Sequence, residues 1–545
     1  MIHRVAQLAD ESRMRAGNIP TFATGPYVLC FWMLLLIGLV SRFSPLFDID
    51  GRLFWQHMTE DGYLMQTIAR NIANGLGMTT SEGTIPTNGV QPLATFLFAA
   101  MHFFAGGSKL IGTLLVTLVS TLVSGAAAYF FYRVGEKVLG NLRHGRELAM
   151  ISAASWFAAP QIVEHSMNGL ETGVYYLALL YTLNFYLTKI SDALWSFGTA
   201  NRLVFGLLLG LTFCARNDAV FFIAGLLAAH LFFGGASAGG GYRNRLTDCL
   251  VAGITSILVS FPWLVYNYSL FGSIMPISGI AESYGYPFGH NLPYLAASLH
   301  EAAFLFVPIP RSLEILAPVI LASIATIVIS VTGFWYYSAR LTLPARRFFV
   351  SGMAFVVCVG VFYGLFFGAT HFLARYVSAL SPFLWLSSVV TAFFVLNLVF
   401  RTPVAVQRSA LALLAVLMVS ALGFAGTNFA QGTTHMHMQV VNWVKENVPE
   451  TQWVGAVQTG TLGFFHDRTI NLDGKVNPDA LRARMQEGHV LDYVVRSKIN
   501  YIADWVGVTD WTTRPESPAF AREFAVVVKD VPGNLGVLKR RRLVE

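Results

Sequence analysis

The stretch that decides the fold lies between residues 59 and 77 and reads TEDGYLMQTIARNIANGLG. Within it, Leu64, Ile68 and Ile72 recur every four residues, which places three apolar side chains on one face of a helix. Glycines follow the last apolar residues, so the helix ends there. We expect an amphipathic helix from Leu64 to Asn74 that lies on the surface of a membrane.

The composition of the whole chain explains why a membrane is expected. Of 545 residues, 54% are hydrophobic and only 12% are charged, and the mean hydropathy is +0.55. Soluble globular proteins carry about 25% charged residues. The composition therefore excludes a soluble globular protein, a disordered chain, a collagen-like fibre and a disulfide scaffold. It predicts a polytopic α-helical membrane protein.

Eleven segments are long and apolar enough to cross a bilayer, which takes about 20 residues. They are 27–47, 109–133, 148–166, 171–189, two within 203–234, 248–270, 314–338, 348–370, 377–399 and 407–427. The segment 92–106 is shorter. If it is a juxtamembrane or re-entrant helix, 16 Lys and Arg of residues 1–434 lie on the cytoplasmic side and 7 lie outside, in line with the positive-inside rule.

The density of charge divides the chain. From residue 435 onward 27 of 111 residues are charged, against 40 of the 434 residues before them. We expect a cytoplasmic N-terminus at 1–26, a transmembrane domain at 27–430 with outer loops 48–108 and 271–313, and an extracytoplasmic α/β domain at 431–545. The four cysteines have no zinc-binding spacing, and the sequence contains no nucleotide-binding motif.

An acidic pair, Glu60-Asp61, stands at the start of the amphipathic helix, on the outer side. A carboxylate at this position caps a helix and interacts favourably with its dipole. A carboxylate beside the bilayer can also act as a general base. The two roles are compatible, because a capping carboxylate can keep one oxygen free.

Further polar residues stand at the outer ends of the expected spans, where charged groups are costly and are usually paired or functional. They are Glu171, Arg216, Asp218, His371 and Arg375. Arg216 and Asp218 can also form a purely structural pair. Because all five share one side of the membrane with the acidic pair, we expect a common polar cavity there.

Several short motifs carry a family resemblance. In chain order they are Glu60-Asp61-Gly62-Tyr63, Ala69-Arg70-Asn71, Gly75-Leu76-Gly77, and the segments 87–93, 168–172, 215–218, 266–276, 375–382 and 460–473. In order and topology they resemble the GT-C glycosyltransferases that use polyprenyl-phosphate sugars. They are most similar to the terminal arabinofuranosyltransferases of mycobacterial type. Two positions depart from the family pattern, since Glu60 replaces the first Asp and Asn217 replaces a Pro.

This resemblance implies a GT-C fold with about 11 transmembrane helices and a C-terminal extracytoplasmic α/β domain. It also implies an inverting transfer of a sugar, with arabinofuranose expected, from a polyprenyl-phosphate donor. The acceptor would be a hydroxyl of a glycan or of a lipid-linked glycan at the outer membrane surface. A donor that resides in the bilayer fits the absence of a nucleotide-binding motif.

The resemblance also implies roles for single residues. Asp61 or Glu60 would be the catalytic base that takes the acceptor proton. Arg216 and Arg375 would hold the departing phosphate. The other substrate-binding candidates are Glu171, Asp218, Arg70, Asn71, Gln91, Tyr268 and His371, with Lys109 as a further phosphate ligand.

The sequence requires no cofactor, and it neither demands nor excludes a divalent cation that bridges carboxylates and phosphate. The expected partners are the donor, the acceptor and the lipid bilayer, without nucleic acid, and the expected location is the plasma membrane of a bacterium. Three alternatives remain. These are another lipid-dependent GT-C enzyme (a mannosyl, aminoarabinose or protein glycosyltransferase), a transporter of lipid-linked glycans, and a non-catalytic glycan-binding scaffold. A transporter is disfavoured because its internal repeats are missing.

Overall fold

The structure is a computed structural model that describes residues 24–142, 144–190, 198–233, 241–338, 343–400, 402–431 and 437–544. Of the expected cytoplasmic N-terminus at 1–26, residues 1–23 lie outside the described part.

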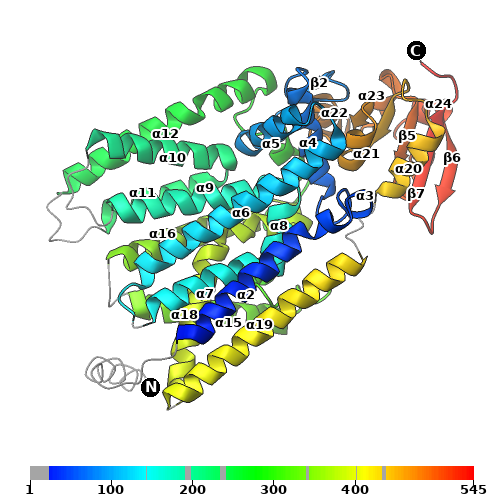
Figure 1. Cartoon of the computed structure of the whole chain (residues 1–545). Coiled ribbons are helices and arrows are strands. Elements are labelled where there is room, and N and C mark those ends of the chain that lie inside the picture. Colours follow the sequence, from blue (N-terminus) through cyan, green and yellow to red (C-terminus); the bar gives the residue numbers. More distant parts are fainter. Residues whose placement is uncertain are drawn as a thin grey trace.

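Most of the chain forms one bundle of apolar helices (Figure 1). Its helices are α2 (Thr24–Phe43), α6 (Lys109–Leu139), α7 (Gly145–Ala158), α8 (Pro160–Met167), α9 (Thr172–Phe185), α10 (Thr199–Ala215), α11 (Ala219–Phe232), α12 (Tyr242–Phe271), α15 (Ala317–Ser338), α16 (Leu343–Val361), α18 (Ser381–Val399) and α19 (Pro403–Gln431). Every one of the eleven expected spans overlaps at least one of these helices.

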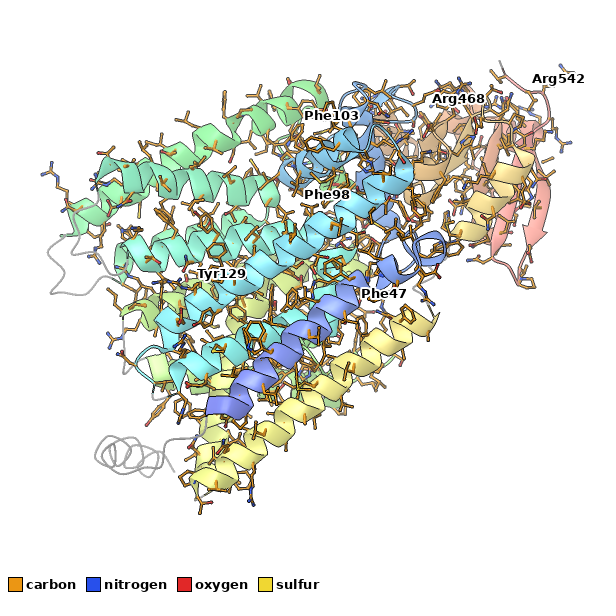
Figure 2. The ribbon with its side chains drawn as sticks, in the orientation of Figure 1. Phe47, Phe98, Phe103, Tyr129, Arg468 and Arg542 are labelled. Carbon is orange, nitrogen blue, oxygen red and sulfur yellow. The ribbon has the colours of Figure 1, made fainter. Side chains whose placement is uncertain are left out.

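Within the described ranges, seven helical stretches are long and apolar enough to cross a membrane. They are Gly25–Phe47, Lys109–Leu139, Tyr242–Phe271, Ala317–Tyr336, Leu343–Phe366, Thr370–Val399 and Pro403–Ala430. Many side chains on the outside of the bundle are aromatic or aliphatic, and Phe47, Phe103 and Tyr129 are more than half exposed (Figure 2). The chain is a multi-pass membrane protein, and the number of eleven crossings stays a prediction.

Glycines allow two helices of the bundle to approach closely. Gly206 and Gly210, one turn apart on α10, face α12. A Cβ atom at Gly206 would lie 2.6 Å from the carbonyl oxygen of Ala252, and one at Gly210 would lie 2.6 Å from Cβ of Val259. Small residues at helix contacts of this kind are typical of membrane bundles, where close backbone approach replaces the hydrophobic effect as the source of attraction.

We predict that Gly206→Ala destabilises the bundle by about 1–3 kcal/mol, because the added methyl group has no space between α10 and α12. Gly253→Ala on α12 is the matched control, since a Cβ there meets no atom within 4 Å. Thermal unfolding of the two variants in detergent checks this. Equal midpoints for both variants would contradict the close contact.

Short elements gather at one end of the bundle (Figure 1). From the first loop come α3 (Ile49–Arg52), α4 (Glu60–Ala73), β1 (Thr79–Thr80), β2 (Ile85–Pro86) and α5 (Pro92–Phe104). From later loops come α13 (Ile277–Ser283), α14 (Leu292–Ala303), η5 (Thr370–Phe372) and α17 (Leu373–Val377). The expected helix at 64–74 is therefore present as α4, but it begins four residues earlier, so the acidic pair forms its first turn.

Residues 438–544, called the C-terminal unit below, form a mixed sheet with helices around it. The elements are α20 (Met438–Asn447), β3 (Val454–Ala456), α21 (Gly460–Phe465), β4 (Thr469–Asn471), α22 (Pro478–Glu487), α23 (Leu491–Arg496), β5 (Tyr501–Asp504), η7 (Val506–Thr513), α24 (Pro518–Glu523), β6 (Phe524–Asp530) and β7 (Leu535–Arg540). The strand order is β4-β3-β5-β7-β6. Strand β3 pairs in parallel with β4 and β5, and β7 pairs antiparallel with β5 and β6.

The C-terminal unit packs on the first-loop elements at this end of the bundle (Figure 1). The ring of Phe464 on α21 lies 5.0 Å from the ring of Tyr63 on α4. Around this apolar contact, Asp467 pairs with Arg70 at 2.9 Å and with Lys109 at 3.2 Å. Burial raises the pKa of Asp467, but these two cations more than offset it, so the net pKa lies below its ordinary value.

Candidate active site

A cavity of about 280 Å³ lies where the bundle, the first loop and the C-terminal unit meet. Among the residues proposed from the sequence, Asp61, Gln91, Glu171, Arg216, Asp218 and Arg375 line it. Other lining residues are aromatic or were not singled out from the sequence, such as Glu282, Phe362, Tyr363, Phe367, Phe372, Tyr376 and Lys475. The structure thus brings together polar side chains from α4, the end of α10, α13, α17 and the C-terminal unit.

The first turn of α4 aims Asp61 at the cavity. Thr59 is the N-cap, and its hydroxyl oxygen accepts a hydrogen bond from the backbone N–H of Gly62 at 3.2 Å. Gly62 then touches the loop before α9, because a Cβ atom there would lie 1.9 Å from the carbonyl oxygen of Asn168. The glycine of the Glu-Asp-Gly-Tyr motif is therefore required for close contact between α4 and this loop.

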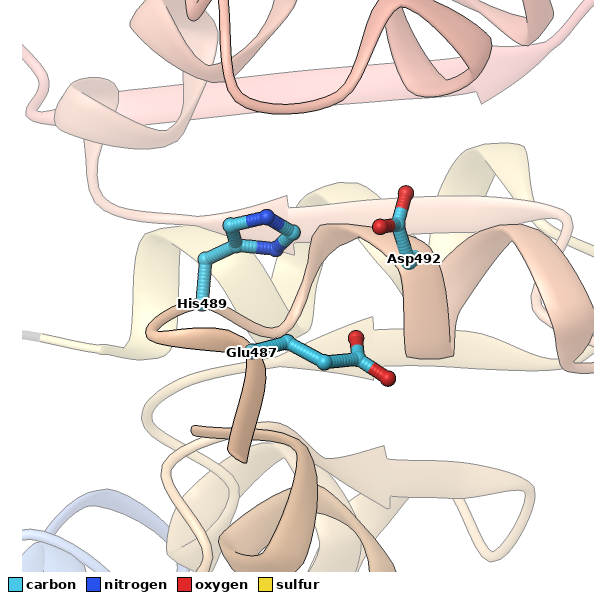
Figure 3. Close-up of side chains that lie close together, drawn as sticks. All are labelled: Glu487, His489 and Asp492. Carbon is cyan, nitrogen blue, oxygen red and sulfur yellow. The ribbon is translucent and has the colours of Figure 1, made fainter. Parts of the chain in front are cut away.

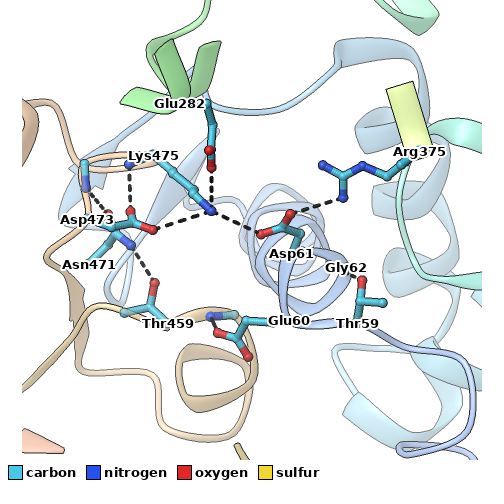
Figure 4. Close-up of polar contacts among 12 residues, drawn as sticks. Thr59, Glu60, Asp61, Gly62, Glu282, Arg375, Thr459, Asn471, Asp473 and Lys475 are labelled. Atoms are coloured by element: carbon cyan, nitrogen blue, oxygen red, sulfur yellow. Dashed lines mark hydrogen bonds and ion pairs between the residues drawn. The ribbon is translucent and has the colours of Figure 1, made fainter. Parts of the chain in front are cut away.

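Two cations flank the carboxylate of Asp61 (Figure 4). Nη1 of Arg375 lies 3.1 Å from one oxygen, and Nζ of Lys475 lies 3.8 Å from the other. Burial raises the pKa of Asp61, but the charges of Lys475 and Arg375 outweigh it, and the net pKa is below its ordinary value. Asp61 is therefore an ionised carboxylate at neutral pH.

The carboxylate of Glu60 points away from Asp61, toward the C-terminal unit (Figure 4). One oxygen accepts a hydrogen bond from the backbone N–H of Gly460. The other accepts from the backbone N–H of Thr461 at 3.0 Å and from the Thr461 hydroxyl. Glu60 therefore caps α21 of another part of the chain, where orphan N–H groups and the helix dipole favour a negative charge. Both of its oxygens are occupied.

Lys475 was not identified from the sequence, yet it lies at the centre of the polar contacts (Figure 4). Its Nζ is 2.6 Å from Glu282, 3.8 Å from Asp473 and 3.8 Å from Asp61. Burial lowers the pKa of this ammonium, but the three carboxylates more than offset it, so the net pKa is raised. The only sequence signal for it was the Asp-Gly-Lys turn at the end of the 460–473 motif.

Arg216 and Asp218 form the pair that their spacing allowed. Nε and Nη2 of Arg216 donate to the two carboxylate oxygens of Asp218 at 3.1 and 2.6 Å. The hydroxyl of Tyr363 donates to Asp218 at 2.7 Å, and Nη1 of Arg216 lies 3.8 Å from Glu171. The side chain of Arg216 is only 3% exposed. Asp218 and Glu171 hold its guanidinium in one orientation.

Four other candidates lie outside the lining of this cavity, each for a physical reason. Arg70 pairs with Asp467, and Asn71 donates to the carbonyl oxygen of Thr79 at 2.9 Å within the first loop. Tyr268 is 66% exposed on α12. His371 is exposed and its ring lies against Phe372. The further phosphate candidate Lys109 pairs with Asp467 as well. Arg70 and Lys109 hold the C-terminal unit through Asp467 and do not line the cavity.

Among the described residues, one group of three side chains could hold a metal ion, Glu487, His489 and Asp492 (Figure 3). It lies in the C-terminal unit, and none of the three lines the cavity. Glu487 pairs with Arg496 at 2.7 Å, and Asp492 accepts from the Ser517 hydroxyl at 2.6 Å, so both carboxylates already have partners. The carboxylates that line the cavity already face cations of the chain, Asp61 and Glu282 facing Lys475, and Glu171 and Asp218 facing Arg216.

Comparisons with solved structures identify the fold. ArnT from Cupriavidus metallidurans bound to undecaprenyl phosphate aligns with a TM-score of 0.58 at 13% identity, covering 95% of this chain and 98% of that one. AglB from Archaeoglobus fulgidus, in complex with an inhibitory peptide and a dolichol-phosphate, aligns with a TM-score of 0.54 at 12% identity, covering 94% and 74%. The chain has the GT-C fold.

Two further similarities concern the whole chain and its C-terminal unit. The arabinofuranosyltransferase AftD from mycobacteria covers 96% of this chain with a TM-score of 0.45 at 11% identity, and this chain covers 40% of it, which is too distant to bear on the sugar. A family model described as "Domain of unknown function (DUF8728)" matches residues 427–536, nearly the whole C-terminal unit. A search of curated protein sequences finds no match.

We predict that Glu60→Ala loosens the contact between α4 and α21. Hydrogen bonds to a charged acceptor contribute about 1.5–3 kcal/mol each, so the amides of Gly460 and Thr461 should exchange at least about tenfold faster. Hydrogen exchange measured by mass spectrometry checks this. Glu82→Ala is the control, because its pair with Arg468 is an exposed one. Unchanged exchange in Glu60→Ala would show that Glu60 does not hold α21.

Proposed function

We propose that the protein is an inverting glycosyltransferase that moves a sugar from a polyprenyl-phosphate donor to an acceptor hydroxyl at the outer membrane surface. The observation that carries the proposal is the ionised carboxylate of Asp61, set between two cations in a cavity at the end of a GT-C bundle. A base beside positive groups is what a displacement at a sugar phosphate requires.

Asp61 is the general base in this proposal, and Glu60 is not. Both oxygens of Glu60 accept hydrogen bonds from α21, whereas Asp61 lines the cavity, and in the described part of the chain its Oδ1 has only the ammonium of Lys475 near it, at 3.8 Å. In the reaction, the acceptor oxygen forms a bond to the anomeric carbon and gives its proton to Asp61. The bond from that carbon to the phosphate oxygen breaks, and the lipid phosphate leaves with the electron pair.

Arg375 holds the donor phosphate, and Arg216 has a positioning role. Among the described residues Nε of Arg375 has no hydrogen-bond partner, so its guanidinium retains a donor for an incoming anion. Nη1 of Arg216 also has no hydrogen-bond partner there, but it lies 3.8 Å from Glu171, and Nε and Nη2 of Arg216 donate to Asp218. Its guanidinium lies 5.0 Å from the ring centroid of Tyr376, so it orders the aromatic wall beside Arg375.

An aromatic wall suits the rest of the donor. Tyr363 and Tyr376 stack with ring centroids 4.8 Å apart and an interplanar angle of 8°, and Phe367 and Phe372 stand beside them. Aromatic faces bind both the apolar face of a sugar and a prenyl chain. The donor class is also supported by ArnT and AglB, whose structures contain undecaprenyl phosphate and dolichol-phosphate.

The sugar and the topology remain part of the proposal. Arabinofuranose rests on the motif resemblance alone, and mannose or aminoarabinose would use the same cavity chemistry. The distribution of Lys and Arg supports a cytoplasmic N-terminus and an extracytoplasmic C-terminal unit, and the family resemblance supports the plasma membrane of a bacterium.

The test is a transfer assay with purified protein, an oligosaccharide acceptor and synthetic polyprenyl-phosphate arabinofuranose or its mannose analogue. We predict that Asp61→Asn lowers kcat by about 10²–10⁴-fold, because the acceptor proton has no base. Asp479→Asn is the control, since its pair with Arg482 is exposed on the C-terminal unit. Full activity of Asp61→Asn would rule out this base, and no transfer by the wild type from either donor would rule out both sugars.

A further inference from the structure

The C-terminal unit matches a family model that is described as a domain of unknown function. In the structure, however, it contributes a side chain to the cavity. Lys475 is the residue of this unit that lines it, and it follows strand β4 through a tight turn. Gly474 in that turn has φ +88°, a conformation that residues with a Cβ atom rarely adopt.

From this we infer that the C-terminal unit completes the active site, with Lys475 as the cation that binds the donor phosphate together with Arg375. The inference rests on the proposed function and extends it by giving the domain of unknown function a role. Lys475 and Arg375 stand on opposite oxygens of Asp61, at 3.8 and 3.1 Å. A phosphate bound next to the base therefore meets a cation from each part of the chain.

The position of Lys475 argues against a purely structural role. Its side chain is 18% exposed, more than those of Arg375 and Arg216, which are 14% and 3% exposed. It is thus the most accessible of the three cations that line the cavity. The ammonium of Lys475 ends a flexible stem and can turn toward an anion by giving up its 2.6 Å contact with Glu282, whereas Asp218 holds two nitrogens of Arg216.

The contact between the first loop and the C-terminal unit, which positions Lys475, is closely packed. A Cβ atom at Gly89 in the first loop would lie 2.1 Å from the carbonyl oxygen of Lys475 itself. A Cβ atom at Gly460 would lie 1.7 Å from the carbonyl oxygen of Glu60. Two glycines, one from each part, therefore set the distance between the first loop and the C-terminal unit. The same distance sets the position of the ammonium relative to Asp61.

The decisive experiment measures binding of undecaprenyl phosphate to the full-length protein in detergent, with neutral undecaprenol as a second probe. We predict that Lys475→Met weakens binding of the phosphate at least about tenfold, because a charge-assisted contact is lost. Binding of undecaprenol should change less than twofold. Lys475→Arg should retain the phosphate affinity within about threefold, and Lys529→Met, on an exposed pair with Asp510, is the matched control.

A second pair of variants tests whether docking of the C-terminal unit positions Lys475, without removing a charge. This pair also tests the inference if Lys475→Met fails to fold. Gly460→Ala should weaken binding of undecaprenyl phosphate at least about fivefold, since the unit must shift away from α4. Gly507→Ala is the control, because a Cβ there meets no atom within 4 Å. Equal affinity of these two variants would overturn the claim that docking positions the cation.

The outcomes separate this inference from the proposed function. If the wild type binds undecaprenyl phosphate and Lys475→Met binds it equally well, the inference is wrong and the proposed function stands. If the wild type binds the phosphate no better than undecaprenol, the proposed donor class is wrong and the inference fails with it. Loss of phosphate binding in Lys475→Met, with Lys475→Arg and Lys529→Met intact, supports both.

The pH profile gives an independent readout. Burial raises the pKa of Asp61 and the cations lower it, so removal of one cation must move the pKa of Asp61 upward. The acid limb of kcat/KM for Lys475→Met should therefore lie at higher pH than that of the wild type. An acid limb at the same pH in both proteins would contradict the contact between Lys475 and the base.

Discussion

The carboxylate of Glu60 makes the contact on which the rest of the site depends. It stands in the first turn of α4 and accepts hydrogen bonds from the backbone N–H groups of Gly460 and Thr461, in the first turn of α21. These N–H groups have no partner within their own helix, so a charged acceptor is strongly favoured there. Asp61 is the next residue, and any movement of Glu60 would carry the proposed base with it.

A second constraint follows from the low exposure of the cavity. Asp61, Glu282 and Asp473 are carboxylates from three separate segments, and each would be costly to bury without a cation. Lys475 lies within 3.8 Å of all three, and Arg375 adds a second charge at Asp61. The charges are balanced only when the C-terminal unit is docked. Docking of this unit therefore supplies one of the two cations that face Asp61, which supports the inference that the unit is part of the site.

The division of labour within the acidic pair shows where sequence reasoning reaches its limit. Both Glu60 and Asp61 were candidates for the base, because capping and catalysis require the same residue type at the same place on a helix. In an α-helix successive residues point about 100° apart, and of the two carboxylates only Asp61 lines the cavity. Which of them faces it depends on what packs against α4. The same reasoning applies to Arg70 and Lys109, whose charges suited a phosphate but pair with Asp467.

Apolar segments of about 20 residues, the four-residue spacing in α4 and the glycines after it are local properties. The amino-acid sequence by itself therefore determined the bundle and the helix at 60–73. The location expected for this helix, on the membrane surface, differs from the structure, where Ile68 is buried in the protein core. The motifs also placed Asp61 in the first outer loop and Glu171, Arg216, Asp218 and Arg375 at the outer ends of expected spans, and in the structure these five line one cavity. Only the tertiary structure decided that Lys475 joins them and that Glu60 faces away. Lys475 lies far from Asp61 in the chain and has no periodic pattern around it, and contacts between such distant residues depend on docking that no local signal encodes.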